Sequence, residues 1–257
     1  MTEVRDMDNI NEVIEAISIG LFVAIFLLNT CRVPKAIDLC IECLCMFKNQ
    51  AGIFEDELAK LICKTVYWTM FRAYYLMDDY TNALKCGTKL HEILRKCGER
   101  TEECAVSIEL ATLYLHKRRY AEAKEICEKA LLTSIAIGDR ITEVICYENL
   151  GTVFQSVSEY VKAKKYLEKA IAMRRELRDM RGEATACGNL GWVFQSVGEY
   201  VKAEEYLRKA LEIQIKIGDR KGEGTSYGNL GIVFQSVGKY CKAREHHEKA
   251  LAIRKEI

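Results

Sequence analysis

Cysteine, histidine and carboxamide side chains are the residues of this chain whose types and spacing could do chemistry. Cys40, Cys43 and Cys45 lie close enough in sequence to resemble a metal-binding or redox cluster. They fall on a helical stretch in which Cys40 and Cys43 take small core positions, and no other cysteine pair has a matching spacing. We therefore expect these thiols to serve as compact apolar side chains rather than as metal ligands.

The histidines give little support for catalysis. His91 and His116 are isolated, whereas His246 and His247 are adjacent on one helix, so their side chains point in different directions and make a poor metal site. The sequence also has no Gly-rich phosphate loop after a strand and no serine, histidine and aspartate order typical of hydrolases. We expect a protein that is not an enzyme and needs no metal or cofactor.

Two rows of carboxamides are the strongest candidates for a binding surface, because each recurs every 40 residues. A carboxamide has both donor and acceptor groups, which suits it to holding the backbone of an extended peptide at regular intervals. The alternative is that these residues tie neighbouring helices together, as buried carboxamides commonly do. The rows are Asn149, Asn189 and Asn229, and Gln155, Gln195 and Gln235.

Aromatic residues add to these rows. Trp192 stands where the neighbouring copies have Thr152 and Ile232, and an exposed indole is a typical peptide anchor, although it could equally fill a packing gap. Further upstream, three residues are expected on the same wall and would make it more aromatic and basic. They are Trp68, Arg72 and Tyr75.

The elements that must position these residues are copies of one unit. The segments 149–171, 189–211 and 229–251 begin with the same Asn-Leu-Gly, and neighbouring segments agree at 17 and then 16 of 23 positions. Self-similarity at a fixed period is the signature of a repeat architecture. Within each copy, apolar residues recur at helical spacing in two stretches, which predicts a pair of helices.

Glycines punctuate the copies. Gly198 separates the two helices of the middle copy, and Gly138 and Gly218 stand between copies, where glycine can take the left-handed conformation that ends a helix. Arg178 occupies the equivalent place after the first copy. We expect the loop at Arg178 to be less regular because the glycine is lost.

The same pattern extends upstream in degraded form. We predict an all-α, right-handed superhelical solenoid of about five antiparallel hairpins. Residues 1–52 form a divergent hairpin, 53–137 two degenerate repeats, and 138–257 three near-identical 40-residue repeats, of which the last lacks a cap. Phe71 falls where a glycine or alanine normally lets the two helices approach, so we expect looser packing or shifted helices there.

The spacing of Leu190, Gly191, Phe194, Tyr200 and Ala203 resembles the tetratricopeptide repeat. The 40-residue period and the Gly-Asn-Leu-Gly phrase are similar to the Partner-of-Inscuteable group of cell-polarity scaffolds and to tetratricopeptide repeat protein 28. The resemblance implies a concave groove, lined by the first helix of each hairpin, that binds extended peptides. In the related scaffolds, asparagines at the matching place contact the ligand.

Composition excludes several other classes. With 38 basic and 37 acidic side chains the net charge is only +1, which gives no field for nucleic acid or an anionic membrane. The apolar run at 16–31 is short for a membrane span and has an acidic flank, so we expect a buried first helix there. The 12 cysteines are irregularly spaced in a long chain, which favours reduced thiols in the cytoplasm.

Together these features favour a cytoplasmic scaffold or adaptor that holds a partner peptide in its groove. Two alternatives stay open. The repeats could assemble the protein with itself, because the chain stops in the second helix of the last hairpin without a polar cap. They could also be the sensor or regulatory arm of a larger protein. RNA binding is disfavoured, since no basic stripe is evident.

Overall fold

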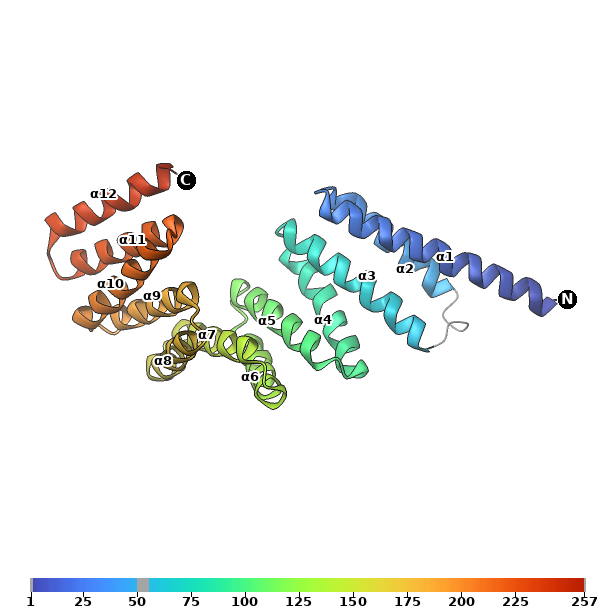
Figure 1. Ribbon diagram of the computed structural model, residues 1–257, viewed down its shortest axis with the longest axis horizontal. Helices are drawn as coiled ribbons and strands as arrows, with labels where there is room; N and C mark the ends of the chain where they lie inside the picture. The colour runs from blue at the N-terminus through green and yellow to red at the C-terminus, as the bar shows by residue number, and fades with distance from the viewer. Residues whose placement is uncertain (1, 50–55, 257) are drawn as a thin grey trace. The chain divides into compact units, whose positions relative to one another are not determined.

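The computed structural model describes residues 2–49 and 56–256, and every regular element within those ranges is an α-helix (Figure 1). Consecutive helices pair within the described ranges, so the predicted all-α array of antiparallel hairpins is confirmed. The helices are α1 Thr2–Asn29, α2 Val33–Asn49, α3 Asp56–Leu76, α4 Tyr80–Cys97, α5 Arg100–His116, α6 Tyr120–Ile137, α7 Arg140–Ser156, α8 Tyr160–Glu176, α9 Met180–Ser196, α10 Tyr200–Ile217, α11 Arg220–Ser236 and α12 Tyr240–Glu256.

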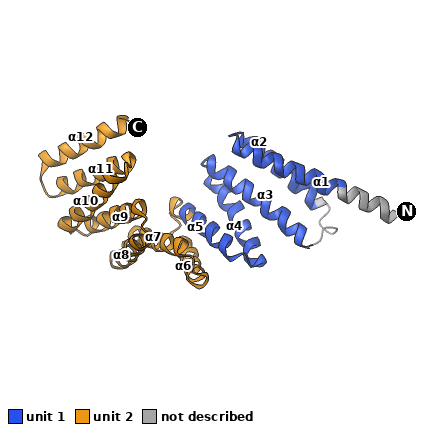
Figure 2. Cartoon of the chain, in the orientation of Figure 1, with its two compact units in different colours: residues 1–113 blue, residues 114–257 orange. Residues whose placement is uncertain are grey.

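The chain divides into two compact units, Met1–Leu113 and Tyr114–Ile257 (Figure 2). The three near-identical copies, α7 with α8, α9 with α10, and α11 with α12, all belong to the second unit. The three-part division drawn from the repeat pattern rests on sequence similarity and stays a prediction.

Each copy is held together by the same apolar layer between its two helices. Leu150, Leu190 and Leu230 of the first helices are completely buried. Burying one leucine stabilises a fold by roughly 1.5–3 kcal/mol. An aromatic pair closes the layer, with ring centroids 5.4 Å apart in both Phe154–Tyr166 and Phe194–Tyr206. A hairpin therefore has an apolar face that only stacking can bury.

Glycines on the first helices let the two helices of a copy approach closely. A Cβ atom added at Gly191 would lie 2.8 Å from Cγ of Leu207, and one at Gly151 would lie 2.7 Å from Cγ of Leu167. Carbon atoms in contact normally lie 3.5 Å or more apart. The leucine of the second helix thus fills the space that the glycine leaves.

The expectation of loose packing at Phe71 is wrong. In this hairpin the first helix supplies the large residue and the second helix supplies the small one, which is the reverse of the later copies. Phe71 is only 1% exposed, and the residue facing it on α4 is Gly87, where an added Cβ would lie 2.7 Å from Cε2 of Phe71. Gly87 stands at the position that Leu167 and Leu207 take in the later copies. The large side chain comes from the first helix here, and the close approach is kept.

The expected irregularity at Arg178 is also absent from the described loop. Arg178 adopts the left-handed conformation itself, with φ at 55°, compared with 74° at Gly138 and 69° at Gly218. Asp179 N–H donates to the Arg174 carbonyl at 2.9 Å, and Asp219 N–H donates to the Gln214 carbonyl at the same distance. The backbone hydrogen bonds override the conformational preference of the side chain.

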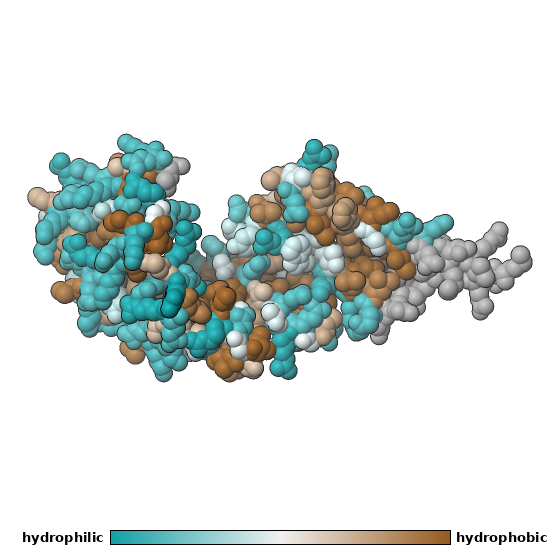
Figure 3. All heavy atoms as spheres, viewed as in Figure 1, coloured by the Kyte–Doolittle hydropathy of each residue, from teal (hydrophilic) through white to brown (hydrophobic). Residues whose placement is uncertain are grey.

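Helix α1 buries one face only. Ile17, Leu21, Ala24 and Leu28 are buried at helical spacing, whereas its other face exposes Ile19, Phe22, Val23 and Phe26. Figure 3 shows hydrophobic residues gathered over the part of unit 1 that contains this helix. By length and composition, Glu12–Asn29 could also cross a membrane, and 22% of it is buried. The prediction of a buried first helix therefore holds for one face.

Candidate functional site

The first helices of the three copies, α7, α9 and α11, lie next to one another in the second unit (Figure 1). An aspartate begins each of them in the same way. Asp179 accepts a hydrogen bond from Gly182 N–H at 2.9 Å, and Asp219 accepts one from Gly222 N–H at 3.0 Å. Such caps satisfy backbone N–H groups that have no partner inside the helix. The shared caps set the same helical register in each copy, so equivalent residues face the same way.

A hollow of about 440 Å³ lies between α9 and α11. It brings together three of the residues predicted from the sequence, Asn189 and Trp192 of α9 and Asn229 of α11. Both asparagines are half-buried, and Trp192 is 45% exposed. Polar hydrogen-bonding groups and an open indole face therefore share one cavity, which is the usual make-up of a site that binds a peptide side chain.

Asn149 continues the asparagine row on α7, but it does not line this hollow. It is half-buried, and its Nδ2 atom is shielded from solvent without a hydrogen-bond partner in the described structure. The Oε1 atom of Gln195 is in the same condition. Neither atom is accessible from solvent, so these missing bonds favour neither the helix ties nor the ligand contacts that were considered for the carboxamide rows.

The glutamine row lies away from the hollow. Gln155 and Gln195 are half-buried, Gln235 is exposed, and none of the three is among the residues that line the cavity. The structure thus brings the asparagine row and Trp192 together at one junction and leaves the glutamine row outside it.

The equivalent junction between α7 and α9 is filled by an arginine. Arg174 of α8 makes a bidentate ion pair with Glu148, at 2.9 Å from Nε and 2.7 Å from Nη2, and Nη1 lies 2.6 Å from Asp179. A Cβ added at Gly182 would lie 2.4 Å from Cδ of Arg174, so the arginine stem rests on the start of α9. Hydrogen bonding to Glu148 raises the pKa of Arg174.

The junction between α9 and α11 differs from the one between α7 and α9 at two positions. Gly188 stands where α7 has Glu148, and Gln214 stands where α8 has Arg174. With its amide nitrogen toward α11, Gln214 donates to Ser226 Oγ at 2.6 Å and to the Gly222 carbonyl at 3.2 Å. The shorter side chain is held down against α11 and only 7% exposed. Gln214 thus lies against Gly222 as Arg174 lies against Gly182, but it is shorter and it lines the hollow at this junction.

Arg181 and Lys221 also line the hollow, and the sequence analysis did not single them out. Both are exposed at equivalent positions of α9 and α11, whereas α7 has Ile141 there. The repeat pattern does not point to these two residues, because it consists of what the copies share and they lie where the copies differ. A comparison of the copies position by position would have shown the change from isoleucine to two cations, and from Glu148 to Gly188.

In the first unit, the predicted residues of α3 do not meet in a cavity. Trp68 is 43% exposed, and Tyr75 packs its ring against Phe71 with centroids 6.4 Å apart, which is a structural role. Arg72 lies 3.5 Å from Glu109 of α5, at the place of the asparagine row. Burial raises the pKa of Glu109, and Arg72 opposes that shift.

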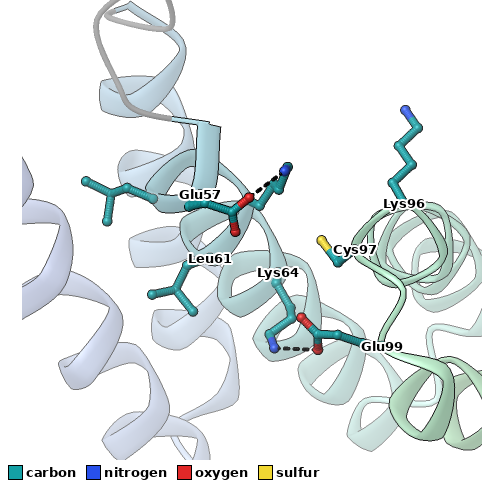
Figure 4. A pocket seen from close by; sticks show the side chains of 8 residues that line it. Glu57, Leu61, Lys64, Lys96, Cys97 and Glu99 are labelled. Atoms are coloured by element: carbon teal, nitrogen blue, oxygen red, sulfur yellow. Dashed lines mark hydrogen bonds and ion pairs between the residues drawn. The ribbon is translucent and has the colours of Figure 1, made fainter.

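A larger hollow of about 560 Å³ also lies in the first unit, between the start of α3 and the end of α4 (Figure 4). Its charged groups mostly satisfy one another, since Lys64 pairs with Glu99 at 2.8 Å and Lys60 pairs with Glu57 at 2.7 Å. None of the predicted site residues lines it. We therefore base the candidate site on the smaller hollow between α9 and α11.

Two of the three cysteines of helix α2, Cys40 and Cys43, behave as core residues, whereas Cys45 is exposed. Cys40 is fully buried and Cys43 is 2% exposed. Burial raises the pKa of Cys40 to about 12, and the neighbouring thiols Cys43 and Cys86 add to this shift. A thiol with so high a pKa is neither a nucleophile nor a ready metal ligand at neutral pH.

The chain belongs to the tetratricopeptide repeat family, whose pattern matches residues 102–176 and 182–256. Such repeats are typically non-catalytic modules for protein interaction or regulation. Among curated proteins none matches the chain.

Several solved structures have the same fold at low sequence identity. A signal-transduction ATPase with a tetratricopeptide repeat sensor, from Pyrococcus horikoshii, aligns with 93% of this chain at 21% identity and a TM-score of 0.76, over 37% of its own length. RapI in its apo form aligns with 93% of the chain at 15% identity and a TM-score of 0.72, over 97% of its length. A Rap protein complexed with Competence and Sporulation Factor aligns with 95% at 17% identity and a TM-score of 0.68, over 77% of its length.

Proposed function

We propose that this chain is a protein-binding scaffold or adaptor that holds an extended segment of a partner protein against α7, α9 and α11. The hollow between α9 and α11, with Asn189, Asn229 and Trp192 on its walls, is the observation that carries the proposal. A peptide backbone needs donors and acceptors from the groove, and the carboxamides supply both. Trp192 offers apolar area that loses little entropy on binding.

One further observation supports a ligand on this fold. The solved Rap structure carries a bound factor on the same fold. The 40-residue period also resembles that of the Partner-of-Inscuteable scaffolds, and this resemblance supports a scaffold role inside the cell.

The test is a selection of dodecapeptides from a random phage-displayed library on the purified chain, followed by anisotropy measurements with the selected peptides. Changing Asn189→Ala together with Asn229→Ala should weaken binding by about tenfold or more, because each removes a buried hydrogen bond to the ligand. Selected peptides that bind the double variant as well as the parent chain would contradict the proposal.

A matched control uses a carboxamide outside the hollow. Gln235→Ala removes the same kind of group from an exposed position of α11 and should leave the affinity unchanged. Thermal unfolding followed by circular dichroism of all variants separates a lost contact from a damaged fold.

A second candidate is a sensor or regulatory arm of a larger protein. The observation that favours it is the alignment of nearly the whole chain with part of a protein that has a tetratricopeptide repeat sensor. Sequencing of full-length transcripts tests it. An open reading frame that joins these repeats to an effector domain is the expected result, and a transcript that encodes the repeats alone would refute it.

A further inference from the structure

We infer that the segment held between α9 and α11 inserts an acidic side chain, a glutamate or an aspartate, into the hollow between Arg181 and Lys221. This inference rests on the proposed function and names the chemistry of the partner. Its basis is the difference between two junctions of the same array, one filled by the chain's own ion pair and the other open and basic.

The filled junction shows what a carboxylate does at this place. Between α7 and α9, Glu148 supplies the carboxylate and Arg174 the guanidinium, and the two side chains are only 15% and 12% exposed. The pair is bidentate, which is the strongest geometry for a carboxylate and an arginine. At this junction the carboxylate of Glu148 is already paired with a cation of the chain itself.

At the open junction the carboxylate is missing but cations remain. Gly188 removes the carboxylate of Glu148, and an added Cβ there would meet no heavy atom within 4 Å. Arg181 and Lys221 line the cavity and make no ion pair within the described part of the chain. Other cations of the three copies do have one, as Arg140, Arg175 and Lys164 illustrate.

The carboxylate already present in the cavity does not neutralise these cations. Asp219 lines the hollow, but its Oδ1 accepts the Gly222 N–H at 3.0 Å, where the positive end of the α11 dipole stabilises it. Two cations therefore face a cavity with one carboxylate that is committed to a cap. An acidic side chain with an apolar neighbour for Trp192 complements this charge pattern.

The experiment uses the same random dodecapeptide library, selected in parallel on the parent chain and on the charge-reversed variant Arg181→Glu with Lys221→Glu. We expect acidic residues to be enriched on the parent chain, and lysine and arginine to be enriched on the variant. A synthetic selected peptide in which the acidic residue is changed from Glu to Gln should bind the parent chain about tenfold more weakly, since a hydrogen bond between charged groups is lost.

A double-mutant cycle ties the effect to one contact. Arg181→Gln should weaken binding of the acidic peptide by about the same factor. The loss of affinity from Arg181→Gln and the loss from the peptide's Glu to Gln change should not be additive. The variant Gly188→Glu, which copies the carboxylate of α7 into the open junction, should abolish binding of the acidic peptide, whereas the uncharged Gly188→Ser should retain most of it.

The outcomes separate this inference from the function on which it rests. Selected peptides without acidic enrichment that still depend on Asn189 and Asn229 would overturn the inference and leave the scaffold intact. A library that yields no peptide dependent on these asparagines would overturn both. A third outcome is that the selection yields no acidic peptides but the chain binds a fluorescent 12-nucleotide RNA. If that binding is lost in the variant Arg181→Gln with Lys221→Gln, the two cations bind phosphate instead of a carboxylate.

Discussion

Backbone conformation affects the stability of the loops within and between copies. Arg178 and Ser158 have φ at 55° and 62°, whereas Gly218 and Gly198 take the equivalent places at 69° and 78°. A residue with a side chain in the left-handed region costs roughly 1–2 kcal/mol. The repeat tolerates this cost at two loops because the flanking helices are fixed by their buried faces.

Arg178→Gly should therefore raise the free energy of unfolding by up to about 1 kcal/mol, because the relief of left-handed strain exceeds the entropy that glycine loses on folding. Urea denaturation followed by circular dichroism measures this. The reciprocal change Gly218→Arg is the control and should lower stability by a similar amount. A less stable Arg178→Gly chain would show that the arginine side chain itself stabilises the loop.

The two helices of a hairpin approach closely where a small residue of one helix faces a large residue of the other. Either helix can supply the small residue. Gly191 faces Leu207 in a regular copy, and Phe71 faces Gly87 in the divergent one. Because the two arrangements fill a similar volume, the hairpin survives the exchange. The partners belong to different helices, so neither helix alone explains its own sequence.

We predict that Gly87→Leu destabilises the chain by several kcal/mol, since the added side chain overlaps the ring of Phe71. Adding Phe71→Gly should recover most of the loss by restoring the arrangement of the later copies. The free energies of the two single variants and the double variant, from urea denaturation, give the coupling. Additive losses would mean that the two residues do not share one packing site.

The periodic spacing of apolar residues predicts most of the fold, whereas the candidate site depends on positions at which the copies differ. The helices, their pairing and the place of Asn189, Asn229 and Trp192 follow from spacing alone, because a core face must recur with the helical period. The compensation by Gly87 could not be predicted, because it depends on which residues of separate helices meet. The change from Glu148 to Gly188 and the cations Arg181 and Lys221 can be found by comparing the copies, but only the structure shows that they line one cavity.

Neighbouring helices dominate the contacts of the whole molecule. The described contacts join helices that are adjacent or one place apart in chain order. In such an array stability is close to a sum of hairpin and interface contributions. The last hairpin is the weakest copy in this sense, because His246 replaces the tyrosine that stacks on Phe154 and Phe194 in the others, and His247 lies over Gly231 where those copies have leucine.

His246→Tyr with His247→Leu should therefore stabilise the last hairpin, by roughly 0.5–1.5 kcal/mol for the aromatic pair alone. Hydrogen exchange followed by mass spectrometry should show slower exchange in α11 and α12 and unchanged exchange in α1 to α4. The matched change Tyr206→His in α10 should have the opposite local effect. Slower exchange spread evenly over both units would contradict nearest-neighbour stability.

Arg174 has a consequence for how a repetitive surface is used. A ligand that meets three nearly identical sets of asparagines could shift by one hairpin and find almost the same contacts, so it would be bound in several overlapping alignments. A side chain that blocks one junction, next to a junction that is open, makes those alignments unequal. In the proposed complex, the array would thereby fix where the partner segment begins and ends, and the near-identical copies would hold it in a single frame.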